Sequence, residues 1–138
     1  MRALSLDYGS ARCGVAISDP TGTIVTPIEP VLRPGTRAGL GRLAALVAER
    51  AVEVVVVGLP ISLAGADTTQ TTETREFAER LRTRLGRAVA VELHDERLTT
   101  RLAQRDPSQD ASEDSRAAAH LLESWLALRR GGSGERSR

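Results

Sequence analysis

The chain has 138 residues, and its 19 basic and 18 acidic side chains leave a formal net charge of only +1. This length predicts a single domain with its own core, and the near-neutral charge disfavours a protein that binds nucleic acid by general electrostatic attraction. The single cysteine excludes an internal disulfide, and no apolar run approaches the roughly 20 residues of a membrane span, so we expect a cytoplasmic protein with no membrane partner.

The N-terminal quarter of the chain predicts three strands. Residues 2–8 alternate between two sets of side chains, and the turn signal "GS" separates them from a second apolar run, "CGVAIS", at 13–18. The two runs therefore predict a hairpin. The segment "TIVTPIEPVL", at 23–32, has strand-like composition, but its two prolines cannot donate backbone hydrogen bonds, which favours an edge position.

The middle of the chain predicts alternating helices and strands. Residues 37–50 carry leucines at helical spacing, and "EVVVVGLP" at 53–60 fits a strand that is buried on both faces. Residues 71–85 predict a second helix, and "RAVAVELHDE" at 87–96 another strand. The inward-facing positions are expected to be Leu40, Leu43, Leu46 and Val47, then Thr74, Phe77, Ala78, Leu81 and Leu85, and then Val89, Val91 and Leu93.

The C-terminal part predicts a short helix near 97–100, a polar loop at 105–112 and a last helix at 113–130. We expect one domain over residues 1–130 and a flexible tail at 131–138, which is rich in Gly and Ser. Early antiparallel strands followed by alternating helices and strands imply an α/β fold, with a mixed sheet and helices on its faces. The apolar stripe of the last helix is Ala118, Leu121, Leu122, Trp125 and Leu128.

Acidic residues stand at the ends of three predicted elements. Asp7 ends the first strand, Asp95 and Glu96 end the last strand, and Asp114 lies in the first turn of the last helix. In α/β sheets, sites form beyond the carboxyl ends of the parallel strands. If the first and last strands are parallel neighbours, Asp7 and Glu96 reach the same rim of the sheet.

By its spacing, Asp114 belongs to the buried stripe of the last helix. It precedes Ala118, Leu121 and Trp125 by whole helical turns. A buried carboxylate is costly without a cation or hydrogen-bond donors, and three converging carboxylates repel one another. Bound Mg²⁺ or Mn²⁺ removes that penalty, and two such ions about 4 Å apart can support phosphodiester cleavage.

Each acid also has an ordinary structural explanation. Asp7 suits a turn before a glycine, and Glu96 and Asp114 suit the first turns of helices. The remaining reactive side chains are expected to be structural, with His94 at a strand end, His120 facing solvent or packing, and Cys13 as a buried small hydrophobe. The run "DTTQTTET" predicts a polar loop with a helix cap, whose hydroxyl groups are a minor candidate for phosphate contact.

Four segments together resemble the YqgF family, the Holliday-junction-resolvase-like proteins to which processing of precursor 16S rRNA is also ascribed. The segments are "LDYGSARCGVAISD", "VVVVGLPISLAGADTTQTTETREFAERL", "VELHDERLTT" and "EDSRAAAHLLESWL". They occur in the order that the family shows and extend from about residue 3 to residue 128. The "HDERLTT" string makes the resemblance specific, whereas "DYG" alone would be weak.

The resemblance implies a ribonuclease H-like fold, with a five-stranded sheet whose second strand is antiparallel to the others and helices on both faces. It implies that Asp7, Glu96 and Asp114 are the catalytic and metal-binding residues of a nuclease that uses Mg²⁺ or Mn²⁺, with two ions expected. The substrate is then a phosphodiester backbone, either precursor ribosomal RNA or branched DNA. Ribosome-assembly components are further expected partners.

The same interpretation explains the sequence around the first acid. The strand ends in Asp7 because the metal lies over the rim of the sheet, and Gly9 allows a tight turn there. Ser10 and Arg12 then reach substrate phosphates beside the ions, and Arg97, which follows Glu96, is assigned to the substrate as well.

One segment departs from the family pattern. Family members commonly carry a longer, Lys-rich stretch before the last acid, whereas this chain has "RDPSQDASED", with one arginine and several acids. This departure weakens the case for tight nucleic-acid binding at that edge. It is compatible with a narrower substrate range, with a partner that supplies positive charge, or with weak activity.

Two other functions remain open. The segment "DYGSARCG" resembles the phosphate loop of the actin and sugar-kinase superfamily, but those enzymes bind nucleotide between two related domains and this chain predicts one. A non-catalytic module that binds RNA or a ribosome-assembly partner fits the near-neutral charge, but it has no need of three costly carboxylates. Thermal stabilisation by nucleotide would favour the first of these functions, and metal-dependent cleavage separates a nuclease from the second.

Overall fold

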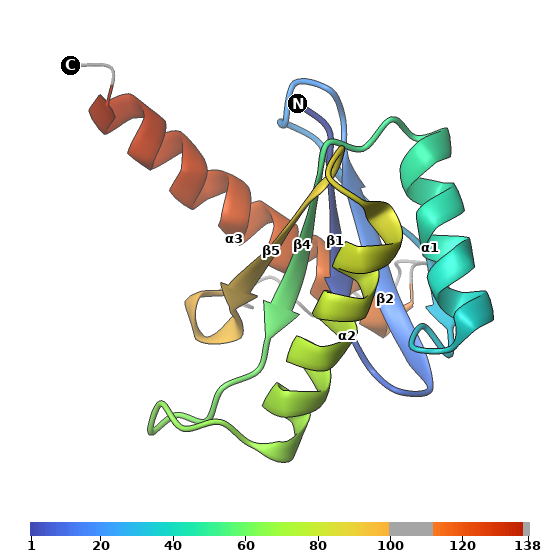
Figure 1. Cartoon of the computed structure of the whole chain (residues 1–138). Coiled ribbons are helices and arrows are strands. Elements are labelled where there is room, and N and C mark those ends of the chain that lie inside the picture. Colours follow the sequence, from blue (N-terminus) through green and yellow to red (C-terminus); the bar gives the residue numbers. More distant parts are fainter. Residues whose placement is uncertain (100–111, 137–138) are drawn as a thin grey trace.

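The computed structural model describes residues 1–99 and 112–136, with side chains described as far as Gly131 (Figure 1). The strands are β1 (Ala3–Asp7), β2 (Arg12–Ser18), β3 (Val25–Leu32), β4 (Val54–Leu59) and β5 (Ala90–Asp95). The helices are α1 (Arg37–Glu49), α2 (Thr69–Leu85), the 3₁₀ turn η1 (Glu96–Leu98) and α3 (Glu113–Arg136). Every element that the sequence predicts within these residues is present.

The strands form one mixed sheet in the order β3-β2-β1-β4-β5. β2 pairs antiparallel with both β1 and β3, whereas β1, β4 and β5 pair in parallel. The second strand is thus antiparallel to the rest, and the proline-bearing β3 lies at an edge, which confirms both expectations. The first and last strands are not neighbours, because β4 lies between them.

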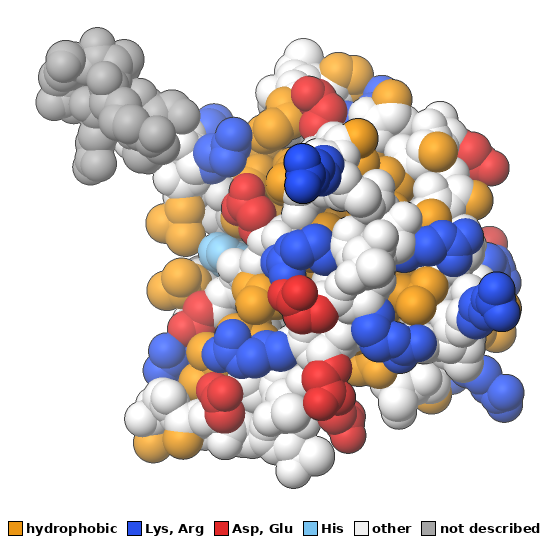
Figure 2. Space-filling view, viewed as in Figure 1, with side chains coloured by type: hydrophobic (Ala, Val, Ile, Leu, Met, Phe, Trp, Pro, Cys, Tyr) orange, Lys and Arg blue, Asp and Glu red, His pale blue; other side chains and the backbone are white. Residues whose placement is uncertain are grey.

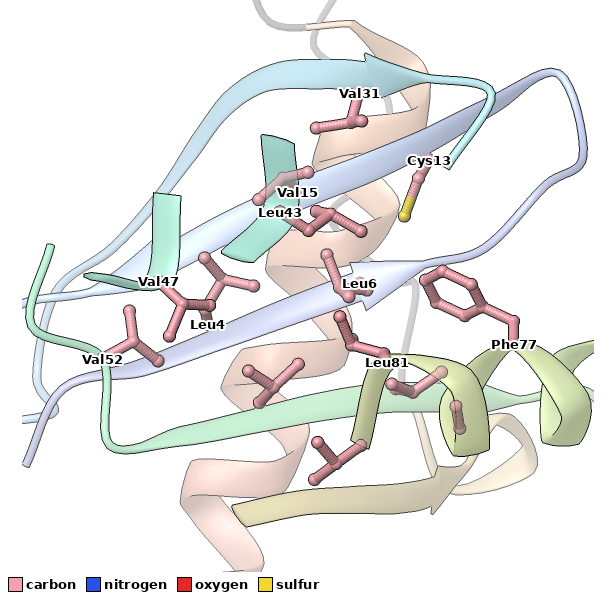
Figure 3. Close-up of a cluster of buried hydrophobic side chains, with 14 of the residues drawn as sticks. Leu4, Leu6, Cys13, Val15, Val31, Leu43, Val47, Val52, Phe77 and Leu81 are labelled. Atoms are coloured by element: carbon pink, nitrogen blue, oxygen red, sulfur yellow. The ribbon is translucent and has the colours of Figure 1, made fainter. Parts of the chain in front are cut away.

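Two helices cover one face of the sheet. Leu4 and Leu6 of β1 point into a core that also contains Leu43 of α1 and Phe77 and Leu81 of α2 (Figure 3). These five side chains are at most 2% exposed. Each such buried side chain stabilises the fold by roughly 1.5–3 kcal/mol, so this core fixes α1 and α2 on the sheet.

The third helix covers the opposite face (Figure 1). The sheet offers it small or branched side chains, among them Ala3, Ala16 and Val56, and α3 packs Leu122 and Trp125 against them. Small residues let the helix backbone approach the sheet closely. Because β1 places Ala3 and Ser5 on this face and Leu4 and Leu6 on the other, alternation along the strand assigns each following residue to a face.

Some details differ from the sequence expectations. α3 continues to Arg136, beyond the predicted end at residue 130, since no proline interrupts the segment 131–136. Leu126, one turn after Leu122, is buried in the core under α3, whereas Leu128 lies on another side of the helix and is 55% exposed. This end of the helix projects away from the sheet (Figure 1). Leu93 is 36% exposed on the edge strand β5. The single-domain boundary at residue 130 remains an expectation.

The loop predicted at 105–112, which precedes α3, lies almost entirely outside the described residues. Within the described part of the chain, no helix is long and apolar enough to cross a membrane.

Candidate active site

Asp7 is the last residue of the central strand β1 and lies between two glycine positions on the neighbouring strands. It pairs with Gly14 of β2. On the other side, Leu6 pairs with Val57 of β4, so Gly58 follows at the level of Asp7. Since Ser5 faces α3, where its hydroxyl donates to the backbone oxygen of Ala118 at 2.6 Å, alternation directs the Asp7 side chain toward the α3 face as well.

Asp114 reaches this rim because the first turn of α3 lies directly on β2. A Cβ atom on Gly14 would stand 2.0 Å from the backbone oxygen of Asp114, so only glycine allows this approach. Buried Ser115 fixes the helix there. Its hydroxyl accepts from the backbone N–H of Val15 at 3.2 Å and donates to the backbone oxygen of Ile28 at 2.6 Å.

Glu96 follows β5 and turns back over β4. A Cβ atom on Gly58 would lie 2.9 Å from Glu96 Oε2 and 3.0 Å from Leu121 of α3, so the carboxylate occupies the space that the glycine leaves free. Because Glu96 and Leu121 of α3 both border this space beside Gly58, Glu96 is also on the α3 face. Asp95 stabilises the turn by accepting a hydrogen bond from the backbone N–H of Arg97 at 2.9 Å.

The three acids therefore stand on one rim and one face of the sheet, with Gly14 and Gly58 making room for two of them. The spacing of Asp114 predicts a place on the buried stripe of α3, and this prediction is wrong. The Asp114 side chain is 42% exposed, and the next residue, Ser115, takes the buried position. The first turn of the helix lies over Gly14, near the start of β2, with Ser115 toward the sheet and the Asp114 side chain toward solvent.

The donor chemistry of this rim fits a hard divalent cation, since carboxylate oxygens are the ligands that Mg²⁺ and Mn²⁺ prefer. The side-chain positions fit it less closely. Among residues 1–99 and 112–136, no group of three or more His, Cys, Asp or Glu side chains is arranged so that it could hold a metal ion. The backbone thus brings the acids to one rim, while their side chains are not arranged around an ion.

Basic and hydroxyl side chains surround the rim. Arg12 begins β2 and lies 3.8 Å from Asp114, with 59% of its side chain exposed. Arg97 makes a two-pronged ion pair with Asp95, with its closest contact at 2.7 Å. Ser10 is exposed in the β1–β2 turn. Arg12 and Ser10 are therefore accessible to a phosphate, whereas Arg97 must leave or share its carboxylate partner.

Cys13 and His94 lie beside the site and have structural roles, as their sequence context indicates. Burial raises the pKa of the Cys13 thiol, and the nearby Asp7 and Asp114 raise it further. Burial lowers the pKa of His94, with Asp95 opposing the shift. Ser124 donates its hydroxyl proton to the backbone oxygen of Leu98 at 3.0 Å, so His94 Nε2 donates to that hydroxyl at 3.2 Å.

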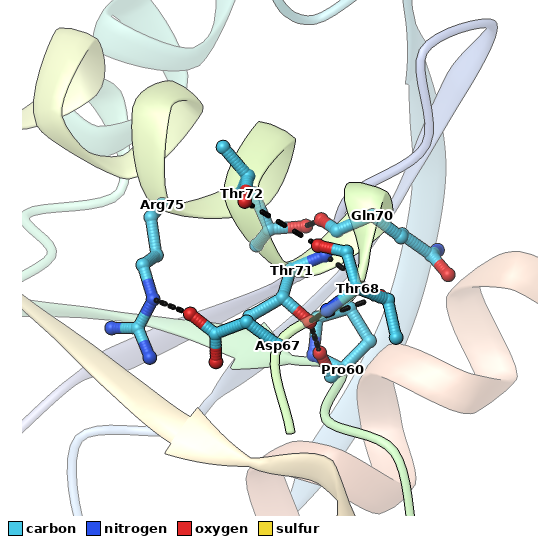
Figure 4. Close-up of polar contacts among 8 residues, drawn as sticks. Pro60, Asp67, Thr68, Gln70, Thr71, Thr72 and Arg75 are labelled. Carbon is cyan, nitrogen blue, oxygen red and sulfur yellow. Dashed lines mark hydrogen bonds and ion pairs between the residues drawn. The ribbon is translucent and has the colours of Figure 1, made fainter.

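The loop between β4 and α2 ends in a network that the sequence predicts only in outline (Figure 4). Thr68 and Thr71 form a capping box, with the backbone N–H of Thr68 donating to Thr71 Oγ1 at 2.9 Å and the N–H of Thr71 donating to Thr68 Oγ1 at 3.2 Å. Thr71 Oγ1 also donates to the backbone oxygen of Pro60. These hydroxyls fix the loop, so they are structural rather than available to phosphate.

Gly14 and Gly58 are the positions that the sequence interpretation missed. Each looks like a glycine inside a strand, which by itself signals only a weakened strand or a close backbone approach. The signal that could have identified them is their register in the sheet, since both glycines stand at the level of Asp7.

Sequence comparisons match nearly the whole chain. The model of the RuvX family, described as Holliday junction resolvase, matches residues 1–128. A protein of Mycolicibacterium paratuberculosis named "Putative pre-16S rRNA nuclease" is 42% identical over 97% of this chain and 84% of its own length. A protein of the same name from Mycobacterium tuberculosis strain H37Rv is 44% identical over 91% of this chain and 78% of its own length.

Structural comparison finds the same fold in much more distant proteins. The Thermus thermophilus RuvC structure has a TM-score of 0.58 at 15% identity and covers 95% of this chain and 97% of its own. RuvC of the same organism in complex with Holliday junction substrate has a TM-score of 0.59 at 13% identity and covers 95% and 96%. At this identity the likeness shows the fold, which is that of ribonuclease H-like proteins.

Proposed function

Because this chain belongs to the RuvX family, we propose that it is a metal-dependent nuclease that hydrolyses phosphodiester bonds of structured nucleic acid, with 5′-end processing of precursor 16S rRNA as its main task. The resemblance to the YqgF family carries the same expectation and is confirmed by the family match and the curated relatives. The observation that carries the proposal is the arrival of Asp7, Glu96 and Asp114 on one rim and one face of the sheet.

In the proposed mechanism Asp7, Glu96 and Asp114 hold Mg²⁺ or Mn²⁺, with two ions expected. When bound, the ions supply an activated water and stabilise charge on the leaving oxygen. Asp7 extends rigidly from the central strand, whereas Glu96 and Asp114 come from a 3₁₀ turn and a helix end. The site can therefore close by rotating the two outer carboxylates toward the fixed one.

Arg12 and Ser10 bind and orient the substrate in this proposal. Arg12 begins β2 next to Asp114, and its exposed guanidinium can donate two hydrogen bonds to a phosphate. Ser10 offers its hydroxyl from the turn that follows the first acid. Arg97 is the weaker candidate, because its ion pair with Asp95 already uses its Nε and Nη2 donors. We further propose a cytoplasmic location, with ribosome-assembly components as partners.

A second substrate is favoured by one observation, the description of the matching family as Holliday junction resolvase. Branched DNA is therefore the alternative substrate of the same acidic rim. The non-catalytic module remains the alternative without chemistry, and the near-neutral charge of the chain is what favours it.

The deciding experiment compares cleavage by wild type and Asp7→Asn. The substrates are a precursor 16S rRNA fragment with its 5′ extension and a four-way DNA junction, each with and without Mg²⁺ or Mn²⁺. We expect metal-dependent cleavage of the RNA, and a loss of at least about 100-fold in rate for Asp7→Asn, since metal ligation supplies several kcal/mol of transition-state stabilisation. Preferential cutting of the junction would assign the DNA substrate instead.

The matched control is Asp67→Asn, which removes the same charge from an exposed acid that pairs only loosely with Arg75, at 3.5 Å. It should cleave like wild type. Circular dichroism must show that both variants are folded. If Asp7→Asn cleaves as fast as Asp67→Asn, the assignment of the acidic rim is wrong, and if wild type cleaves neither substrate with either metal, the non-catalytic module is favoured.

A further inference from the structure

An open pocket lies beside the acidic rim, on the face of the sheet that α1 and α2 cover. Its walls come from the β1–β2 turn, the β3–α1 turn and α2, and its polar lining consists of Tyr8, Ser10, Arg33, Thr36 and Arg80. Tyr8 directly follows Asp7, so alternation directs the two side chains to opposite faces. The pocket and the acids therefore adjoin across the end of one strand.

The pocket is positively charged. Two guanidinium groups line it, from Arg33 and Arg80, and no carboxylate does. Neither arginine makes an ion pair within residues 1–99 and 112–136. Elsewhere on the face formed by α1 and α2, basic and acidic side chains are interspersed (Figure 2). Among the described residues, two arginines without a salt bridge thus line one opening that has no carboxylate in its lining.

Arg33 is held in a backbone conformation that a side-chain-bearing residue rarely adopts. Its φ is 46°, and such strain persists only where the surrounding structure enforces it. Its N–H donates to the backbone oxygen of Ala11 at 2.9 Å, and its own oxygen accepts from the hydroxyl of Thr36 at 2.8 Å. A Cβ on Gly39 would stand 2.1 Å from that oxygen, so α1 also closes on it. A glycine would be easier to accommodate here, which points to a role for the arginine side chain.

Arg80 is positioned through its own helix. Phe77, one turn earlier on α2, stacks on Tyr8 with ring centroids 4.3 Å apart. Gly35 brings the β3–α1 turn against the same group, since a Cβ there would lie 3.3 Å from the Tyr8 hydroxyl and 3.7 Å from an Arg80 nitrogen. Burial raises the pKa of Tyr8, and Glu73 of α2 raises it further, but neither Glu73 nor Glu76 lines the pocket.

We propose that this pocket binds a backbone phosphate of the nucleic-acid strand, next to the phosphate held at the acidic rim. The inference rests on the proposed function and adds Arg33 and Arg80 to the substrate-binding residues. Arginine suits the role, because its planar group donates two hydrogen bonds to a phosphate. The pocket is open rather than enclosed, and its lining residue Tyr8 directly follows Asp7. A strand that crosses the β1–β2 turn can therefore reach both the acidic rim and the pocket.

The test measures binding rather than cleavage. The probe is a single-stranded RNA with the 5′ flank of precursor 16S rRNA, bound without divalent metal to protein that carries Asp7→Asn. We expect Arg33→Gln with Arg80→Gln to weaken binding by about tenfold for each arginine. The dependence of log affinity on log salt should become shallower by about 0.7 for each phosphate that the variant no longer neutralises.

The matched control is Arg50→Gln with Arg87→Gln, which removes the same charge at the opposite end of the sheet, after α1 and after α2. It should leave the affinity near that of the parent. Equal affinity and equal salt dependence for the two double variants would overturn the proposal. The cleavage assay with Asp7→Asn tests the proposed function independently of this result.

Two further experiments test the same proposal. If the pocket double variant does not fold, Ala11→Asp decides, because Ala11 is an exposed lining residue and the change places a negative charge in the pocket. It should weaken RNA binding relative to Ala11→Asn. Equal binding by these two would overturn the proposal. Inorganic phosphate and a mononucleotide are tested by thermal shift. If the arginine pair is needed for those ligands but not for the RNA, the pocket takes a free phosphate compound and the strand assignment is wrong.

Discussion

At the scale of single residues, the site depends on two glycines as much as on the acids. Gly14 and Gly58 leave the space into which α3 and Glu96 fit. Neither glycine takes part in chemistry. Their effect is to let a helix end and a carboxylate lie directly on the sheet, which is why a change at either position should act on the acids.

Gly14→Ala is expected to destabilise the protein. The added methyl group would meet backbone atoms of Asp114 and Ser115 at 2.0–2.9 Å, which cannot move without shifting the first turn of α3. Overpacking of this kind costs about 1–3 kcal/mol or more. Urea unfolding measures the change. The control is Gly41→Ala on α1, where the nearest atom is an Arg84 guanidinium nitrogen at 3.5 Å, and where alanine should add up to about 1 kcal/mol. A Gly14→Ala protein as stable as wild type would contradict the close approach.

His94 should make stability depend on pH. Burial lowers its pKa below the ordinary value of 6.5, so the unfolded chain takes up a proton more readily than the folded one. Stability is therefore complete above about pH 6.5 and is lost as the pH falls from there toward the lower folded-state pKa. His94→Gln keeps a donor for Ser124 but does not titrate. Urea midpoints between about pH 5 and about pH 8 should fall less steeply for this variant. Parallel profiles for the two proteins would show that His94 does not contribute.

At the scale of elements, the entry to α2 is fixed by hydroxyl groups. Thr71 is fully buried, and its Oγ1 serves Thr68 and Pro60 together. The loop between β4 and α2, in which a Cβ on Gly65 would lie 3.6 Å from an Arg97 nitrogen, is thereby attached to the start of α2. Here a polar side chain, in addition to apolar packing, fixes the path of the backbone.

Thr71→Val tests that attachment. Valine has nearly the same shape, so the main change is the loss of hydrogen bonds to buried or half-buried backbone groups, which should cost about 1–3 kcal/mol. Thermal or urea unfolding measures it. Thr72→Val is the control on the same helix, because Thr72 is exposed and its hydroxyl makes only one long contact, at 3.4 Å. Its effect should stay within about 0.5 kcal/mol. Equal effects of the two substitutions would show that the capping network adds no stability.

At the scale of the whole molecule, two cores share one sheet. β1 and β4 supply Leu4 and Val55 to the core under α1 and α2, and Ala3 and Val56 to the core under α3. Neither core can be lost without exposing the central strands. We therefore expect the two faces to unfold together.

Leu122→Ala examines this coupling. Leu122 is fully buried under α3, so its truncation should cost about 2–5 kcal/mol. Trp125 lies in the same core, and its fluorescence should change at the same urea concentration as the far-ultraviolet circular dichroism. Leu128→Ala, at a residue that is 55% exposed, is the control and should stay within about 0.5 kcal/mol. Separate fluorescence and dichroism midpoints would show that α3 detaches alone.

The sequence by itself determined the elements and most of their environments. Alternation in β1, the four valines of β4 and the helical spacing in α2 are local patterns, and each follows from the geometry of a strand or helix. The acids at the ends of elements, the edge position of β3 and the antiparallel hairpin were also predictable, because prolines, turn residues and chain order act over short distances. The family resemblance added the strand arrangement, and it is the source of the roles proposed for the acids.

Only the tertiary structure decided how these elements meet. Spacing placed Asp114 on the buried side of its helix, but packing on Gly14 puts its side chain at the open rim and buries Ser115 instead. Chain order made the first and last strands possible neighbours, but β4 separates them. The pocket of Arg33 and Arg80 joins side chains from separate elements and has no local pattern at all. The physical reason is the same in each case: the contact depends on a close approach between segments far apart in the chain, which only the packed sheet and helices define.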